Sequence, residues 1–583
     1  MSQFSWLLPV PVLLPLLAAG LALVLGRWPR AQKTIALVAL TITTIVSAVL
    51  AAAANEGPVV LDVGNWAAPI GITLVADRLA ATMLLVSQIV TLAVLIYSMA
   101  QSVIDENPQT PVAIYFPTFL ILSAGVANAF LTGDLFNLYV GFEILLAASF
   151  VLITLGATRG RIRAGTVYVV VSLVSSAIFL AGVALTYAAT GTINMAQLAQ
   201  RLPEIDPGTS LMIQVVLLTA FGIKAAIFPL HAWLPDSYPT APAPVTAVFA
   251  GLMTKVGVYG LIRLQVLLFP EGRLTTLLTI IGIATMLLGI VGAVAQDDIK
   301  RLLSFTLVSH IGFMIWGLAL VDEVGLASTI YYAAHHILVQ TTLFLIAGLI
   351  ERKTGTTSLA RLFGLYRTTP VIAVLFLIAG INLIGIPPLT GFIGKLGLAR
   401  ASVEAATLQA WLLLGAGMVT SFLTLYAVIK WWNLAFWQSD EDSQSYLSNT
   451  NVRPDATDRV KRRAEKQLER ARQAHRSVAA PSQSASVLSR TEAEMGQSTN
   501  SRIMYGVVIG LIGVQAAMAI WSGSVWDYVE RAAQDQRAGT PYVTAVLGED
   551  GRGSGNSDEK SGGTKTTEGA PDPTAPQSEG GAR

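Results

Sequence analysis

The segment GIKAAIFPLHAWLPD (residues 222–236) decides how this chain folds, because it places a lysine and prolines at the end of a long apolar run. It follows LMIQVVLLTAF (211–221), so Lys224 falls inside a stretch that is apolar enough to cross a bilayer. Pro229 removes a backbone donor five residues later and clashes with the preceding helical turn. The pattern predicts a membrane-spanning helix that is broken close to a buried lysine.

Composition places the whole chain among integral membrane proteins. Of its 583 residues, 53% are hydrophobic and 13% are charged, and the mean hydropathy is +0.60. The 38 basic and 36 acidic residues give a net charge of +2, which does not favour a nucleic-acid partner. Cysteine is absent, which excludes disulfides, thiolate-held iron–sulfur clusters and cysteine zinc sites. We expect a protein of the lipid bilayer without a redox centre, cofactor or metal of its own.

Apolar runs of about 20 residues, long enough to cross about 30 Å of hydrocarbon, recur along the chain. Fourteen such runs begin near Trp6, Gln32, Thr73, Val112, Asp134, Ile162, Ser210, Ala243, Leu274, Lys300, Gly325, Pro370, Leu408 and Arg502. The predicted fold class is therefore an all-α polytopic membrane protein with about fourteen spans.

Basic residues gather in the loops after spans 1, 5, 9 and 11. These residues are Arg27, Arg30, Lys33, Arg159, Arg161, Arg163, Lys300, Arg301, Arg352, Lys353, Arg361 and Arg367. Positively charged loops remain on the cytoplasmic side of a membrane, and the intervening loops 55–69 and 321–325 lack Lys and Arg. With an even number of spans, both termini are predicted on the outer face.

The chain is expected to have one membrane domain and two hydrophilic segments. The membrane domain covers residues 1–437 with its translocating core at about 110–437, and the last span covers 502–525. Between them, 438–501 has charges of both signs at helical spacing, which is typical of a solvated cytoplasmic helix. The C-terminal tail, 526–583, is rich in Gly, Ser, Pro and charges from about 548, so we expect disorder there.

Several charged residues fall inside the predicted spans, among them Glu143, Lys224, Lys255 and Lys395. Each charge at the bilayer centre costs roughly 2.5–3.5 kcal/mol on insertion scales, so such residues are functional candidates. A single lysine could instead extend to an interface or form an ion pair that only fixes packing. Burial destabilises the charged form of lysine and a nearby carboxylate stabilises it, so movement of Glu143 relative to Lys224 would switch proton affinity.

Four of the five histidines lie in or beside spans. His335 and His336 are adjacent in one span, and histidine exchanges protons near neutral pH, so they are candidates to pass a proton between lysines. Packing through ordinary hydrogen bonds is the alternative for both, and it is the favoured interpretation for His310. His231 and Asp236 follow Lys224 and are candidates for steps toward the cytoplasmic side.

Prolines also precede Lys395. Pro387 and Pro388 lie seven and eight residues before it, so spans 7 and 12 both combine a helix break with a buried lysine. Irregular backbone at membrane depth is tolerated where it is buried in protein or lines a water-filled cavity. Because the two broken spans are five apart, spans 4–8 and 9–13 are predicted to be two versions of a five-helix unit, inverted relative to each other.

Five segments together resemble the antiporter-like subunits that respiratory complex I shares with Mrp cation/proton antiporters. They are DLFNLYVGFEI (134–144), FPLHAWLPDSYPTAPAPVTA (228–247), AQDDIKRLLSFTLVSHIG (295–312), HHILVQTTLFLIAGLIE (335–351) and GIPPLTGFIGK (385–395). Within this family LDVGNWAAPIGITLVAD (61–77), SFLTLYAVIKWWNLAFW (421–437) and PYVTAVLG (541–548) resemble the D-type subunits of Mrp complexes.

The resemblance implies a fourteen-helix subunit of a bacterial cell membrane. Its partners would be Mrp subunits of the A, C, E, F and G types, and it would exchange protons for Na+, with K+ and Li+ as alternatives. It also implies a relay in which Glu143 pairs with Lys224, and which continues through Lys255 and His335 or His336 to Lys395. Many relatives have a lysine where this chain has Gln340, and a neutral amide cannot bind a proton there.

Three other functions compete with the antiporter interpretation. A proton-pumping membrane-arm subunit of complex I or of a membrane-bound hydrogenase would share the ionisable residues, and only the D-type segments distinguish it. A quinone-reducing enzyme is disfavoured because cysteine, a dinucleotide-binding GxGxxG motif and a soluble catalytic domain are all missing. A purely structural subunit would tolerate loss of the buried lysines. We expect a secondary transporter subunit and not an enzyme.

Overall fold

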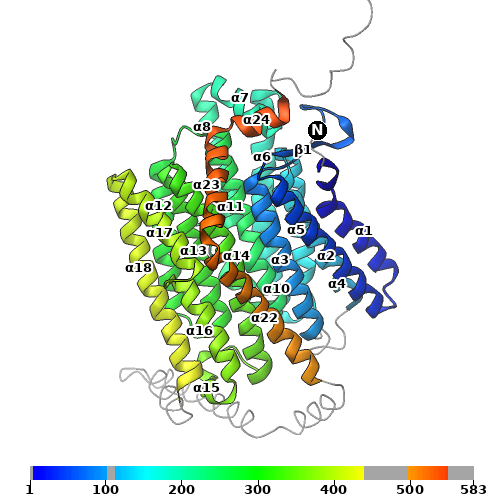
Figure 1. Ribbon diagram of the computed structural model, residues 1–583, viewed down its shortest axis with the longest axis vertical. Coiled ribbons are helices and arrows are strands. Elements are labelled where there is room, and N and C mark those ends of the chain that lie inside the picture. Colours follow the sequence, from blue (N-terminus) through cyan, green and yellow to red (C-terminus); the bar gives the residue numbers. More distant parts are fainter. Residues whose placement is uncertain (1–3, 102–111, 439–496, 549–583) are drawn as a thin grey trace, which may run out of the picture.

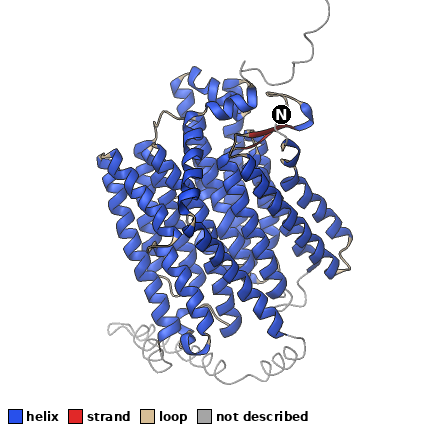
Figure 2. Ribbon diagram, in the orientation of Figure 1, coloured by secondary structure: helices blue, strands red, loops and turns tan. Residues whose placement is uncertain are grey.

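The computed structural model describes residues 4–101, 112–438 and 497–548. Within these residues, thirteen helices are long and apolar enough to cross a membrane, and Figure 2 shows a structure that is almost entirely helical. The predicted all-α polytopic fold is confirmed in outline. The predicted insert, apart from its two ends, and the predicted disordered tail after 548 lie outside the described residues.

The N-terminal half of the described bundle consists of six long helices and one short one. They are α1 (Val10–Val24), α2 (Pro29–Ala53), α3 (Arg78–Gln101), α4 (Val112–Leu131), α5 (Leu135–Thr154), α6 (Arg159–Thr190) and the short α7 (Met195–Arg201). The short 3-10 turns are η1 (Ser5–Leu7), η2 (Val63–Asn65), η3 (Leu202–Glu204), η4 (Tyr238–Thr240) and η7 (Leu359–Arg361).

The prediction that the third span begins near Thr73 is wrong. Thr73–Ala76 form strand β2, which pairs antiparallel with β1 (Val59–Asp62), so the fold also has one small sheet. The segment is apolar and buried, but its Thr and Val suit a strand, and hydropathy alone does not separate the two structures. Helix α3 begins only after Asp77, whose carboxylate accepts a 2.8 Å hydrogen bond from the Ala80 N–H.

The seventh span is divided, as predicted. Helix α8 (Pro207–Ala225) ends at Ala226, which has left-handed backbone angles (φ 58°, ψ 48°), and the chain resumes as α9 (Trp233–Ser237). The break therefore starts three residues before Pro229. Next comes a span with two π-helical stretches, built from α10 (Ala243–Val248), η5 (Phe249–Met253), α11 (Thr254–Ile262) and η6 (Arg263–Leu268).

The C-terminal half contains the second divided span. Its helices are α12 (Thr275–Val294), α13 (Ile299–Leu320), α14 (Glu323–Thr354), α15 (Leu365–Thr368), α16 (Pro370–Ile384), α17 (Thr390–Ala405), α18 (Leu408–Trp431) with the π-helical η8 (Trp432–Trp437), α22 (Gln497–Ile520), α23 (Ser522–Ala538) and α24 (Thr540–Leu547). The expected twelfth span is split into α16 and α17 at Gly385 (φ 88°), so neither half is among the thirteen helices long enough to cross a membrane. The inverted repeat stays a prediction.

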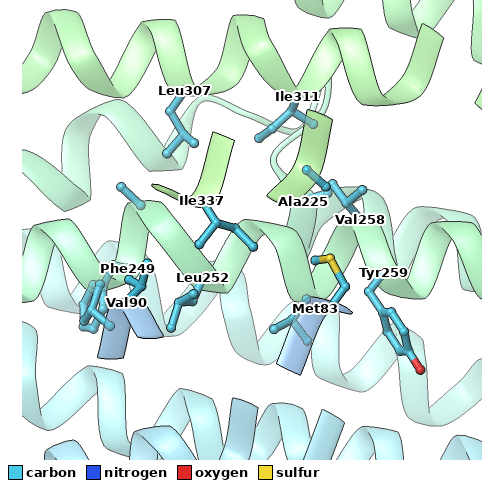
Figure 3. Packing of buried hydrophobic residues seen from close by; sticks show 14 of the residues in the cluster. Met83, Val90, Ala225, Phe249, Leu252, Val258, Tyr259, Leu307, Ile311 and Ile337 are labelled. Atoms are coloured by element: carbon cyan, nitrogen blue, oxygen red, sulfur yellow. The ribbon is translucent and has the colours of Figure 1, made fainter. Parts of the chain in front are cut away.

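Helix α14 is the centre of the bundle. Its apolar stretch is wholly buried, and it packs against α3, α10, α13, α16, α17, α22 and α23. Figure 1 shows α1 and α2 at one side of the bundle and α12 and α18 at the other, with β1, α7 and α24 at one end. Apolar side chains of α3, η5, α11, α13 and α14 pack together in the core, including Met83, Phe249 and Ile337 (Figure 3).

Candidate proton pathway

The three candidate lysines, Lys224, Lys255 and Lys395, lie at or beside irregular points of the helical backbone. Lys224 occupies the last turn of α8, where its Nζ donates a 3.2 Å hydrogen bond to the Ser176 hydroxyl. Lys255 follows the π-helical η5, and its Nζ donates to the Ala250 carbonyl at 2.7 Å. Lys395 reaches back from α17 to the Ile384 carbonyl at the end of α16, also at 2.7 Å. For Lys255 and Lys395, carbonyls freed by irregular helices thus stabilise the cation.

Glu143 on α5 is the acidic residue that interacts electrostatically with Lys224. The two side chains are close enough to interact electrostatically, yet no ion pair joins them in the described part of the chain. Oε1 of Glu143 is buried without a hydrogen-bond partner among the described residues. Beside Lys224, a cavity of about 20 Å³ is lined by Phe142, Tyr168 and other residues, which is room for about one water molecule. Lys224 lines this cavity, whereas Glu143 is not among its lining residues.

Three histidines form one cluster between α13 and α14. The His310 and His336 ring centroids are 5.3 Å apart, and His310 Nδ1 is 2.9 Å from the Tyr332 hydroxyl. His335, beside His336, has its Nδ1 2.8 Å from the Thr390 hydroxyl. All three imidazoles are buried. His310, which sequence reasoning favoured as a packing residue, is brought into contact with the predicted pair because α13 and α14 are antiparallel neighbours.

The histidine cluster lies within electrostatic range of two of the lysines. Lys255 and Lys395 both lie close enough to His336 to interact electrostatically with it. Lys395 Nζ also lies 4.6 Å from the centre of the Phe313 ring, which packs against His310. Gln340 lies apart from these contacts, because its Nε2 donates to the Leu303 carbonyl at 2.7 Å. The structure therefore arranges Lys255, the histidines and Lys395 as one group, with Glu143 and Lys224 as a second.

The supporting residues lie at helix breaks and ends. Pro229, Pro387 and Pro388 are exposed on the surface of the chain, within the two breaks. His231 is half-buried, packs against Phe228, and has an Nδ1 without a hydrogen-bond partner in the described part of the chain. Asp236 is exposed and forms a 3.2 Å ion pair with Arg301, one of the residues predicted to be cytoplasmic.

Sequence reasoning missed a buried ion pair at the opposite end of the bundle. Arg263 of η6 donates two hydrogen bonds, of 2.7 and 2.8 Å, to the carboxylate of Asp77, and each side chain is 2% exposed. Gln536 of α23 bonds to both partners at 2.7 Å, and the Tyr542 ring of α24 covers the guanidinium. Arg263 was visible as a charge inside an apolar run, but its partners are distant in sequence.

Gly257 of α11 lets the lysine-bearing end of α8 approach. A Cβ at this position would lie 2.6 Å from the Ala225 backbone nitrogen and 2.9 Å from the Lys224 carbonyl carbon. Real Cβ atoms do not come so close to backbone, so Gly257→Ala should displace the last turn of α8.

We expect the Gly257→Ala variant to assemble less well and to lose most proton movement across the membrane, because overpacking of this kind costs about 1–3 kcal/mol. Assembly is checked by size-exclusion chromatography and proton movement with a pH-sensitive dye in vesicles. Gly415→Ala in α18, where a Cβ meets no atom within 4 Å, is the matched control. Equal behaviour of the two variants would contradict this close approach.

Comparison with known proteins identifies relatives along most of the chain. A family model described as NADH:quinone oxidoreductase/Mrp antiporter, TM, matches residues 132–424. A protein of Alkalihalophilus pseudofirmus, named as the D subunit of a Na(+)/H(+) antiporter, is 39% identical over 439 residues, which cover 75% of this chain and 88% of the relative. The protein of the same name from Bacillus subtilis is 36% identical over 438 residues, covering 74% and 87%.

Solved structures share the fold. A chain of the Mrp complex from Dietzia sp. has a TM-score of 0.79 and 29% identity, covering 94% of this chain and all of that one. A chain of the membrane-bound sulfane sulfur reductase, an archaeal respiratory membrane complex, has a TM-score of 0.76 at 23% identity, covering 94% of this chain and all of that one. The second similarity concerns the fold alone. Taken with the family match and the curated relatives, these findings show that the chain belongs to the NADH:quinone oxidoreductase/Mrp antiporter transmembrane family.

Proposed function

We propose that this chain is the D-type subunit of a multisubunit Na+/H+ antiporter and that it supplies a transmembrane proton path. The observation that carries the proposal is the row of lysines and histidines inside the bundle, with each lysine held at an irregular point of a helix. Named relatives at 36–39% identity support the antiport assignment. The path would run from Glu143 and Lys224 through Lys255 and the histidine cluster to Lys395.

The path works through changes of proton affinity along a line of buried and half-buried groups. An ammonium without a carboxylate partner is destabilised away from water, so Lys224 holds its proton better when Glu143 approaches. Release of that proton toward Lys255 and the histidines would follow when Glu143 withdraws. Downhill proton movement then drives cation export, and each charge that crosses 100 mV of membrane potential is worth about 2.3 kcal/mol.

We further propose the surroundings of the subunit. Its partners are other Mrp subunits, of the A, C, E, F and G types, and its cation is Na+, with K+ and Li+ as alternatives. The lack of cysteine throughout the chain supports a subunit without its own redox centre. We place it in a bacterial cell membrane.

Both termini are proposed to lie on the outer face. Basic residues from three predicted cytoplasmic loops meet at one end of the bundle. Lys300 pairs with Glu351 at 2.7 Å, Arg161 donates to the Thr240 carbonyl, and Arg352 donates to the Gln101 carbonyl. This clustering is what the positive-inside rule requires of the cytoplasmic face.

Ion exchange in membrane vesicles tests the proposal. Everted vesicles that contain the complete complex and hold an acid interior should release protons when Na+ is added, as a pH-sensitive dye reports. Vesicles from cells without the complex provide the background rate. If Na+, K+ and Li+ all leave the rate at background, the antiport function is wrong.

A further inference from the structure

A buried glutamine in the last span links two parts of the bundle. Gln515 of α22 is 4% exposed, its Oε1 accepts a 2.8 Å hydrogen bond from Asn382 Nδ2, and its Nε2 donates to the Thr342 hydroxyl at 2.9 Å. Helix α22 runs along the outside of the bundle (Figure 1) and contributes none of the proposed proton carriers. Gln515 is therefore outside the pathway but tied to the break between α16 and α17.

The hydrogen bonds that start at Thr342 have a fixed direction. The Thr342 hydroxyl donates to the Leu338 carbonyl at 2.7 Å, so its oxygen is left to accept from Gln515. Gln515 must then present its amide oxygen to Asn382, which donates through Nδ2. At the other end of that side chain, Asn382 Oδ1 accepts from the Gly391 N–H at 2.9 Å, and a backbone N–H can only donate. The bond to Thr342 at one end and the bond from the Gly391 N–H at the other thus require the same orientation of the Gln515 and Asn382 side-chain amides.

The same direction reaches His335 through Thr390. Asn382 Oδ1 also accepts from the Thr390 hydroxyl at 3.1 Å, which uses the single hydrogen of that hydroxyl. While the hydroxyl donates to Asn382, the Thr390 oxygen, 2.8 Å from His335 Nδ1, accepts a hydrogen bond from that nitrogen, which then carries the hydrogen of the neutral ring. Nε2 of His335 keeps its lone pair in the neutral ring, and this buried atom has no hydrogen-bond partner among the described residues.

We propose that Gln515 is a positioning residue that fixes His335 as the Nδ1–H tautomer, so that Nε2 is the atom that takes up a proton. This inference rests on the proposed proton path. A proton that binds the Nε2 lone pair forms an imidazolium, and the same proton leaves from Nε2 afterwards. Departure through Nδ1 would require the Thr390 hydroxyl to turn from Asn382 to the imidazole, which breaks its hydrogen bond to Asn382 Oδ1. His335 therefore binds and releases a proton through Nε2.

Solid-state NMR of the complex tests the tautomer directly. With histidine labelled by ¹⁵N in the full-length chain, the signals that disappear in His335→Gln identify this residue. At neutral pH the wild-type ring should show a protonated Nδ1 and an unprotonated Nε2. In Gln515→Leu the hydrogen bonds to Asn382 and Thr342 are lost, and a second set of signals from the Nε2–H tautomer should appear. A wild-type ring protonated at Nε2, or unchanged signals in Gln515→Leu, would overturn the inference.

Transport and rescue separate positioning from mere packing. Gln515→Leu should lower the exchange rate by a factor of about 5 to 25, because two buried neutral hydrogen bonds are lost and each represents a factor of about five. Gln515→Glu, as a neutral carboxylic acid, can donate to Thr342 and accept from Asn382, so it should restore both signals and rate. Thr390→Val should lower the exchange rate as much as Gln515→Leu does. The double variant should be no slower than either single variant, because both substitutions interrupt the same series of hydrogen bonds.

The matched control is a buried glutamine elsewhere in the bundle. Gln88 of α3 accepts hydrogen bonds from Thr43 and Ser123, and Gln88→Leu should leave the His335 signals and the exchange rate as in wild type. An equal loss in this control would contradict a specific role for Gln515. Absence of exchange in the wild-type complex would instead overturn the proposed function, while the NMR signals alone still decide the tautomer.

Discussion

Vesicles that contain the Glu143→Gln variant should exchange no protons for cations, although the complex assembles normally. Glutamine keeps the size of the side chain but cannot become charged, so Lys224 loses the carboxylate that interacts with it. Removal of a proton-transfer group typically costs a factor of about 100 or more, so the expected rate is at background. Dye-reported proton release on addition of Na+ measures the rate, and size-exclusion chromatography measures assembly.

Lys224→Ala should give the same loss, and the double variant should be no worse, because the two residues act as one station. Glu404→Gln is the control, since Glu404 is exposed on α17 and pairs with the exposed Arg400. Wild-type exchange in either Glu143→Gln or Lys224→Ala would remove the pair from the proton path. Loss of assembly with loss of exchange would point instead to a structural role.

Asp77→Asn should destabilise the protein by about 3–5 kcal/mol, the usual cost of leaving a buried charge without its partner. Asparagine still accepts the Ala80 N–H, so the capping role is kept, but its NH₂ group would face the donors of Arg263 and Gln536, and these hydrogen bonds are lost together with the charge. Arg263, 2% exposed, would remain as an uncompensated cation. Thermal unfolding in detergent, followed by intrinsic fluorescence, measures the change.

A compensating variant makes this prediction specific. Asp77→Asn combined with Arg263→Met removes both charges and should recover most of the lost stability, since a buried ion pair often gives little net stabilisation over apolar residues. Arg400→Gln, which breaks an exposed ion pair, should leave the unfolding temperature unchanged. Additive losses in the Asp77/Arg263 double variant would contradict a direct interaction between the two charges.

Hydropathy was sufficient to predict most of this fold, because crossing a bilayer demands long apolar helices. Hydropathy failed where the backbone groups of an apolar segment form hydrogen bonds in a sheet instead of a helix. Thr73–Ala76 pairs with Val59–Asp62 and forms a strand, although its composition suits a span equally well. The sequence pattern also placed the breaks at the prolines, whereas the helices end earlier, at Ala226 and Gly385, where the backbone turns left-handed.

Site residues could be predicted where a charge inside an apolar span costs free energy by itself. They could not be predicted where the role of a residue depends on a partner that is distant in sequence. Charged residues at Glu143, Lys224, Lys255 and Lys395 stand out because a bilayer penalises them. Gln515 is a neutral amide in an apolar run. Nothing in the nearby sequence indicates that Asn382 Nδ2 lies 2.8 Å from its Oε1. Only the folded arrangement of α16 and α22 reveals it.

The contact between Asp77, Arg263 and Gln536 also has a consequence for biosynthesis. Asp77 and Arg263 are 186 residues apart in the chain, and Gln536 follows 273 residues after Arg263. A growing chain therefore contains Asp77 before it contains Arg263, and the glutamine that completes the contact is made 273 residues after the arginine. A chain that stops before α23 would lack Gln536, so Asp77 and Arg263 would be left without the glutamine that hydrogen-bonds to both of them.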